Sequence, residues 1–266
     1  MSRWTARMRA AAAKRGRTWG EPRSANGASS FHLIWEIPHV ALSEVSATIE
    51  VLDLPAVKRI YFWALQASFV SGRQIQGGAH LGLQWHPKYP GGTAANWGGY
   101  GPADRGTREL EGSTSALPSS RDNPNTRDFP WTPGNRYRLH IGPSPDSEGP
   151  LYAWRGSITC LETGEATLIR DLYTRGEFLM SPMVWTEAFA RCEHPSVSVR
   201  WSDLEAVAID RSVLHPPHIR VNYQSRGDGG CDNTTASTDE LGVLQTTATP
   251  REVPQGAMLP CPSGRG

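Results

Sequence analysis

The chain has 266 residues, enough for one large β-domain or two small ones with a substantial buried core. Its formal net charge of +1 argues against bulk electrostatic binding to nucleic acid or to a membrane surface. No apolar run approaches the roughly 20 residues of a membrane-spanning helix. Ten tryptophans together with 27 glycines and 21 prolines are typical of an all-β protein with many turns.

The first 29 residues are basic and lack the apolar segment of a signal peptide. Their composition favours a flexible tail, disordered or weakly helical, over an amphipathic targeting helix or a misassigned start site. We therefore expect a tail over residues 1–29, a single β-sandwich domain over 30–250 and a C-terminal tail over 251–266. These features do not indicate the cellular compartment of the protein.

Strand-like segments follow one another from Phe31 to Tyr223, and only the N-terminal arm and a weak stretch at 187–192 suit a helix. The segments with alternating apolar residues include FHLIWEI, SATIEVLDL, RIYFWALQASFV, AHLGLQW, NRYRLHIGP, LYAWRGSITCL and HIRVNYQS. Side chains alternate across a strand with period two, so each segment has one apolar face. The pattern predicts an all-β, two-sheet antiparallel sandwich of jelly-roll or lectin-like type.

The polar faces of four of these strands carry Gln, His and Arg in place of the usual Ser, Thr, Lys and Glu. If the strands are neighbours, these side chains form one cationic, donor-rich surface suited to a hydroxylated or carboxylated ligand. The alternative is an ordinary solvated outer face, because strand order is not visible in the sequence. The residues predicted to converge are Gln66, Gln84, His86, Arg136, Arg138 and Arg155.

A turn-rich segment from His86 to Gly134 begins with aromatic residues interleaved with glycines. Aromatic rings stack on the apolar faces of sugars, while amide and imidazole groups bond to hydroxyls. Tyr89, Asn96, Trp97 and Tyr100 are therefore predicted ligand contacts, with Trp85 buried. The alternative is an aromatic loop folded onto its own sandwich.

The four cysteines, Cys160, Cys192, Cys231 and Cys261, are too far apart in sequence for a zinc ribbon or a CxxC redox site. Two disulfides or buried free thiols are both compatible with an even count. Cys231–Cys261 is the preferred pair, because it would close a polar C-terminal segment. No cofactor is expected apart from a possible structural calcium bound through Asp228 and Asp232.

Two stretches, GGAHLGLQWHP and VNYQSRGDGGCDNTT…GVLQTT, resemble bacterial proteins of unknown function with lectin-like β-sandwiches. The resemblance spans about residues 30–250. It implies an extracellular location, leaves the ligand unassigned, and brings no catalytic residue with it.

Catalysis has weaker support in the sequence. Jelly-roll alginate lyases use Arg-Glu-Leu and Gln-X-His motifs, and this chain contains Arg108-Glu109-Leu110 and Gln84-Trp85-His86, but in reversed order and without the final tyrosine-rich motif. In a lyase, Arg136 or Arg138 would neutralise a uronate carboxylate, and His86 or Tyr89 would transfer a proton. A glycoside hydrolase is the other enzyme class left open, with Glu187, Asp203 and Glu205 as its carboxylates, although they do not form the paired strand motif typical of such enzymes.

The sequence therefore predicts a protein that binds carbohydrate or another polar polymer without catalysis, with a polysaccharide lyase as the alternative and a structural or interaction domain as the third reading. No membrane span and no nucleic-acid partner are expected. The oligomeric state is open.

Overall fold

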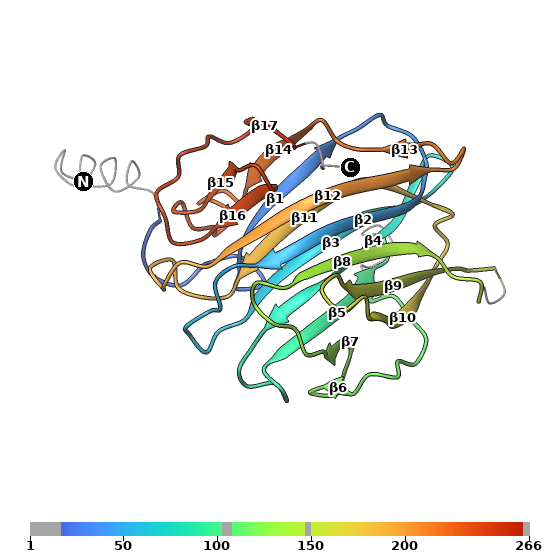
Figure 1. Cartoon of the computed structure of the whole chain (residues 1–266), viewed down its shortest axis with the longest axis horizontal. Helices are drawn as coiled ribbons and strands as arrows, with labels where there is room; N and C mark the ends of the chain where they lie inside the picture. The colour runs from blue at the N-terminus through green and yellow to red at the C-terminus, as the bar shows by residue number, and fades with distance from the viewer. Residues whose placement is uncertain (1–16, 103–107, 147–149, 263–266) are drawn as a thin grey trace, which may run out of the picture.

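The computed structural model describes residues 17–102, 108–146 and 150–262, and these residues form seventeen β-strands and no α-helix (Figure 1). All strand pairings are antiparallel, and the strands divide into two stacked sheets. The predicted all-β, two-sheet antiparallel sandwich is thus confirmed. Residues 1–16 of the predicted tail lie outside the described residues.

Sheet I contains the strands that run across the front of Figure 1, with β2 near its middle. Its order is β15 (Thr235–Thr238), β16 (Val243–Thr246), β12 (Ser198–Ala208), β2 (Leu42–Val51), β8 (Arg136–Pro143), β9 (Tyr152–Cys160) and β10 (Ala166–Thr174), with β13 (Val213–Leu214) beside the far half of β12.

Sheet II is built around the long hairpin of β3 and β4. Its order is β17 (Met258–Pro260), β14 (His218–Tyr223), β1 (Ser29–Glu36), β11 (Phe178–Ala188), β3 (Tyr61–Ser71), β4 (Gln74–Trp85), β5 (Thr93–Tyr100), β7 (Asn123–Asp128) and β6 (Ser119–Ser120). A single registered pair, Leu42 with Leu179, joins β2 of sheet I to β11 of sheet II.

The core lies between the sheets and is filled by the apolar sets that the alternation predicts. Sheet I contributes residues such as Val45, Ala47, Ile49, Leu139, Ile158 and Trp201, and sheet II contributes Phe31, Leu33, Trp63, Leu65, Phe69, Leu81, Leu83 and Trp97, all at most 1% exposed. Burial of this apolar surface drives the sheets together.

Trp97 shows how closely the two sheets approach one another. It lies on β5 of sheet II, and its indole N–H donates to the Trp154 carbonyl on β9 of sheet I at 3.3 Å. Its ring also covers Gly156, where an added Cβ would lie 2.7 Å from the Trp97 Cγ atom. A residue with a side chain at position 156 would therefore collide with the ring.

The structure corrects several details of the predicted elements. Much of the segment expected to be loop forms strand β5, so the glycines around Trp97 are strand residues. Residues 187–192 contain no helix, and Glu187 belongs to β11. Within the expected C-terminal tail, Met258–Pro260 pairs with β14 at the edge of sheet II.

No helix in the described part of the chain is long and apolar enough to cross a membrane.

Candidate functional site

The predicted cationic surface does not form, because its members lie on opposite faces of the molecule. Gln66 and Gln84 point outward from sheet II, whereas Arg136, Arg138 and Arg155 point outward from sheet I. The two outer faces are separated by the whole core. The prediction of convergence was therefore wrong. The period-two pattern shows which side chains share one face of a strand, but it does not show which sheet that strand joins.

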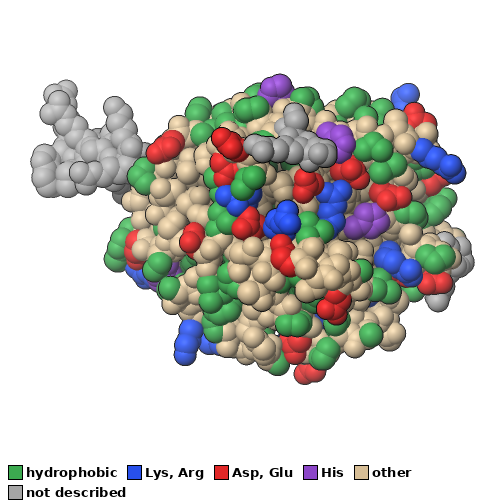
Figure 2. Space-filling model, viewed as in Figure 1, with side chains coloured by type: hydrophobic (Ala, Val, Ile, Leu, Met, Phe, Trp, Pro, Cys, Tyr) green, Lys and Arg blue, Asp and Glu red, His purple; other side chains and the backbone are tan. Residues whose placement is uncertain are grey.

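The three arginines are also neutralised where they lie. Arg136 pairs with Glu162 at 3.2 Å and Arg138 with Glu205 at 3.3 Å. Figure 2 shows basic and acidic side chains interleaved over the face where β2, β8 and β12 run. Each of these partly exposed ion pairs contributes little to the stability of the fold. Together they leave no concentrated positive charge to attract an anionic polymer.

Arg155 has the most elaborate partners of the three. Its guanidinium bonds to Asp171, Asp146 and Ser144 at distances of 2.9–3.0 Å. The side-chain hydrogen bond to Asp171 is the main reason that the pKa of Arg155 is raised. This group holds β9 to β10 and engages the Nε and Nη2 donors of the guanidinium, which leaves Nη1 outside these bonds.

The aromatic residues of the β4–β5 region also differ from their predicted roles. Trp97 is 0% exposed, so the prediction that it contacts a ligand was wrong. Alternation along β5 sends Trp97 inward, and Trp85, expected to be fully buried, is half-buried at the edge of the core. His86 and Tyr89 stack on each other with ring centroids 4.4 Å apart and lie in the turn after β4.

Four of the predicted contacts do share the outer face of sheet II. The register places Gln66 opposite His80, Gln84 opposite Ala94, and Asn96 opposite Gly82. Tyr100 is on the same face, opposite Gly78. The other members of this face come from β1, β3 and β11. We call it the amide–aromatic face and define it by His32, Phe62, Gln66, His80, Gln84, Asn96, Met183, Trp185 and Glu187.

Aromatic rings and one amide form the centre of this face. The Trp185 ring lies edge-on to Phe62, with centroids 4.8 Å apart, and to His80, with centroids 5.6 Å apart. The Trp185 indole N–H donates to the Gln66 Oε1 atom at 2.9 Å. The face is therefore preorganised by ring contacts and by one fixed carboxamide, whose N–H2 group is not used in this bond.

The two histidines of the face are held neutral by their surroundings. Burial lowers the pKa of His80 to about 4. Burial also lowers the pKa of His32, a shift that the hydrogen bond with the Asn222 backbone partly offsets. At neutral pH neither imidazole contributes a positive charge, which makes the centre of the face polar but uncharged.

Several polar atoms of the face are buried without a partner among the described residues. They are Gln84 Oε1, Asn96 Oδ1 and His32 Nδ1. Asn96 does donate its amide to Thr126 Oγ1 at 2.7 Å, so it is the carbonyl oxygen that is left over. Buried acceptors without partners are rare in folded proteins and call for a water or a ligand.

A glycine at the middle of the face brings two strands unusually close. An added Cβ at Gly82 would lie 2.8 Å from the Ala64 Cβ atom, whereas opposite Cβ atoms in ordinary sheets are roughly 4.5–5.5 Å apart. The Trp63 carbonyl and Ala64 of β3 occupy the space that a side chain at position 82 would need. Gly82 is therefore required for the close packing of β4 against β3.

The carboxylates of the face lie at its margins. Glu187 accepts hydrogen bonds from Ser30 Oγ at 2.9 Å and Asn26 Nδ2 at 3.1 Å. Asp128 accepts from Ser120 Oγ at 2.6 Å. Four strand-to-strand steps separate Glu187 from Asp128 in the register, which corresponds to about 19 Å. They cannot act together on one bond.

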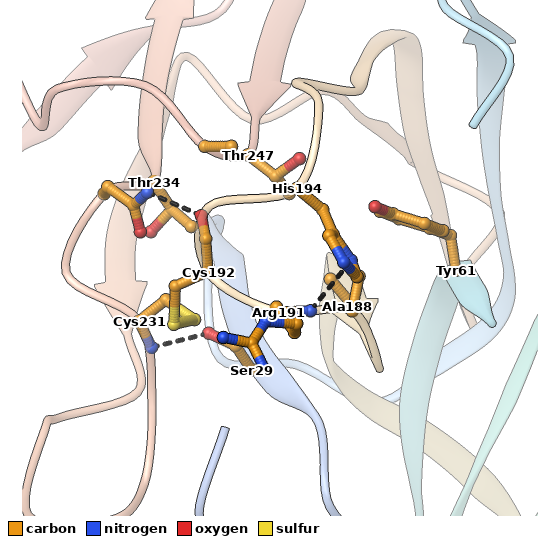
Figure 3. Close-up of a pocket in the computed structure, with 12 residues that line it drawn as sticks. Ser29, Tyr61, Ala188, Arg191, Cys192, His194, Cys231, Thr234 and Thr247 are labelled. Atoms are coloured by element: carbon orange, nitrogen blue, oxygen red, sulfur yellow. Dashed lines mark hydrogen bonds between the residues drawn. A yellow bond between two sulfur atoms is a disulfide. The ribbon is translucent and has the colours of Figure 1, made fainter. Parts of the chain in front are cut away.

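The end of the face near Glu187 is held by a disulfide. Cys192 follows β11 and is bonded to Cys231, whose backbone N–H donates to Ser29 Oγ at 2.8 Å (Figure 3). The preferred Cys231–Cys261 pair was therefore wrong, and Cys160 and Cys261 are free. Fold geometry brings the loop after β11 against the loop after β14, a contact that sequence separation does not reveal.

The cavity beside this disulfide is too small for an organic ligand. Arg191, His194 and Tyr61 line it in Figure 3, and its volume of about 10 Å³ accommodates at most one water molecule. Its role is structural, since it lies where the ends of β1 and β11 are fixed.

The predicted calcium ligands are engaged with the protein. Asp228 accepts from Ser225 Oγ at 2.6 Å, and Asp232 lies 3.8 Å from the Arg251 guanidinium. Across the described residues no three His, Cys, Asp or Glu side chains are grouped as a metal site. Structural calcium stays a prediction.

No protein-family model matches the chain, and no curated protein matches it. Among solved structures, the chain is similar to scytalido-glutamic peptidase bound to a peptide-based transition-state analogue, with 10% identity, a TM-score of 0.47, and coverage of 83% of this chain and 98% of that one. It is also similar to SCP-B, a member of the eqolisin family of peptidases in complex with the tripeptide Ala-Ile-His, with 9% identity, a TM-score of 0.48, and the same coverages.

These similarities correct the expected resemblance to lectin-like proteins, since the similar structures are those of peptidases. The prediction of carbohydrate binding, with lyase activity as its alternative, is corrected with it, and the split and neutralised arginines remove its physical basis. The level of similarity assigns no activity to this chain.

Sequence reasoning missed most of the centre of the amide–aromatic face. Phe62 and Ala64 lie on the polar side of an aromatic strand, so the period-two pattern places them correctly but gives no reason to select them. The outward position of Trp185 was not predicted, because a bulge in β11 between Met180 and Met183 shifts the alternation of side chains. The signal available in the sequence was the outward set His80, Gly82 and Gln84 on β4.

Proposed function

We propose that the amide–aromatic face binds an extended polypeptide segment without hydrolysing it. The observation that carries the proposal is the pair of buried amides, Gln84 and Asn96, each with a carbonyl oxygen that lacks a partner within the described structure. They lie diagonally across β4 and β5 above Gly82. Carbonyl oxygens in this position suit the repeated N–H donors of an extended peptide backbone.

The rest of the face supports this ligand class. Phe62 and Trp185, each at most 5% exposed, form an apolar floor beneath the amides, while the uncharged histidines add no electrostatic preference. Both amides are only 7% exposed, so each must turn outward as a chain arrives. Removing the penalty of an unpaired buried oxygen then contributes to affinity.

The arrangement of side chains argues for binding rather than hydrolysis. Met183 lies directly opposite Gln66 on β11, and a thioether has no proton to give or take. Glu187 lies opposite Phe62. Phe62 is four residues from Gln66 along β3, so Glu187 and Gln66 are about 13 Å apart along the strand direction. The described face thus lacks a carboxylate beside its central amide.

A library of random N-acetylated nonapeptide amides, applied to the immobilised full-length protein, tests the proposal. We expect capture of a subset of peptides, intact by mass spectrometry. Gln84→Leu should raise the Kd of the captured peptides about fivefold or more, because one hydrogen bond between uncharged groups is lost. Arg138→Gln, on the opposite outer face, is the matched control and should leave Kd unchanged. Cleaved peptides, or equal capture by the Gln84→Leu variant, would overturn the proposal.

A further inference from the structure

A hollow of about 550 Å³ continues the amide–aromatic face beyond Gln66. Ser68 and Val70 are the next outward residues of β3, and the register places them opposite Met180 and Phe178 of β11. The hollow is lined by these four residues together with His39, Ala41, Gly72, Arg73, Ile75 and Ser181. A chain lying along β3 on the amide–aromatic face therefore leads directly into it.

The floor of the hollow is apolar. Val70 is 5% exposed, and Phe178 and Met180 are half-buried beside it. Ile75 forms a wall and is 62% exposed, an unusual exposure for an isoleucine next to a cavity. Covering this surface with an apolar side chain would remove it from water.

The rim of the hollow is cationic. Arg73 and His39 are both exposed there, and no Asp or Glu is among the described residues that line it. The Arg73 side chain makes no hydrogen bond or ion pair within the described part of the chain, in contrast to the paired arginines of sheet I. Its guanidinium is free to bind a carboxylate.

The hollow also lies where the sheet ends. The β3–β4 turn at Gly72 and Arg73 closes one side, and the segment around His39 and Ala41, which enters β2, closes another. An extended chain that follows β3 beyond Ser68 reaches these walls within about two residues. Both the apolar floor and the cationic rim are then presented to one ligand residue.

We infer that this hollow receives the C-terminal residue of the bound peptide, with an apolar side chain on Val70 and Ile75 and the terminal carboxylate on Arg73. This inference rests on the proposed peptide binding and adds direction and specificity to it. The chain would run with its C-terminus toward the β3–β4 turn and its preceding residues over Gln66 and Gln84.

Two matched nonapeptide libraries, random at eight positions and ending in leucine as the free acid or as the amide, provide the probe. The immobilised full-length protein should retain the free acids about tenfold more than the amides, as expected for a hydrogen-bonded ion pair. Arg73→Gln should reduce this ratio to near one while leaving retention of the amides unchanged. Lys58→Gln, an exposed substitution with the same change in charge, should keep the ratio of the wild type.

A second pair of libraries, ending in leucine or glycine as free acids, tests the apolar floor. Ile75→Ser should abolish the preference for leucine and leave the preference for free acids. If acids and amides are retained equally, and Gln84→Leu still weakens both, the inference about the hollow is wrong and peptide binding stands. If neither library is retained, peptide binding itself is wrong.

Discussion

Trp185 on β11 donates its indole N–H to the carboxamide oxygen of Gln66 on β3, at 2.9 Å. The bond ties the two central strands of sheet II on their outer side, where backbone pairing alone would leave an aromatic ring with an unsatisfied donor. Trp185 is 4% exposed, so water cannot replace Gln66 as the acceptor without a change in packing. The centre of the amide–aromatic face therefore has one preferred arrangement.

Gln66→Leu should lower the free energy of unfolding by about 1–3 kcal/mol, because it leaves the buried indole N–H without an acceptor. Urea denaturation of both proteins measures the difference. Gln66→Glu is the control, since a carboxylate oxygen still accepts from Trp185. An unchanged midpoint in Gln66→Leu would show that the indole finds another partner and that the bond does not organise the face.

The contact between Trp97 and Gly156 should couple the two sheets energetically. Gly156→Ala places a Cβ against the indole and should destabilise the fold by about 1–3 kcal/mol. Trp97→Leu removes the ring and should cost about 3–5 kcal/mol through the cavity it leaves. The double variant should lose less stability than the two single variants lose together, by about 1 kcal/mol or more. The reason is that Leu at position 97 leaves room for the new methyl group. Strict additivity in denaturation experiments would contradict the contact.

The period-two pattern was sufficient to predict the sandwich and most of its core. Residues such as Leu81 and Leu83 on β4, or Tyr137 and Leu139 on β8, are buried as the alternation requires. The same pattern left sheet membership undetermined. Gln84 and Arg138 are both outward residues, but β4 and β8 belong to different sheets, and only long-range pairing decides this.

The candidate site was harder to predict than the fold for a related reason. A glycine-rich sequence around Trp97 has the composition of a loop, yet β5 is held on one side by β4 and on the other by β7. Backbone pairing supplied by neighbours overrides a weak local propensity. The disulfide depends in the same way on contacts between loops distant in sequence, since Cys192 and Cys231 are 39 positions apart.

Loss of the Cys192–Cys231 disulfide should lower stability by about 2–4 kcal/mol, because it frees a closed loop of 39 residues in the unfolded chain. Denaturation with and without a reductant measures the effect. In Cys192→Ala/Cys231→Ala the reductant should have no influence, while Cys160→Ala/Cys261→Ala should respond as the wild type does. Sensitivity to reductant in the first variant would contradict the pairing.

His80 should make the protein less stable as the pH falls below neutrality. Burial lowers its pKa from 6.5 to about 4 in the folded protein, whereas the unfolded chain keeps the ordinary value. Between these values the unfolded chain binds a proton that the folded protein excludes, so the free energy of unfolding decreases as the pH is lowered. The loss begins near pH 6.5, is complete below about pH 4, and amounts to about 3 kcal/mol for this residue.

His80→Gln tests this prediction, because an amide keeps polarity at the position but does not titrate. The free energy of unfolding from urea denaturation, measured at intervals from pH 7 to pH 4, should fall less steeply in this variant than in the wild type. His32 has a pKa shifted in the same direction, so some pH dependence should persist. His218→Gln, at an exposed position on β14, is the control and should follow the wild type. Parallel curves for wild type and His80→Gln would mean that the folded protein accommodates the protonated imidazole, and that the ring cluster with Phe62 and Trp185 opens without cost.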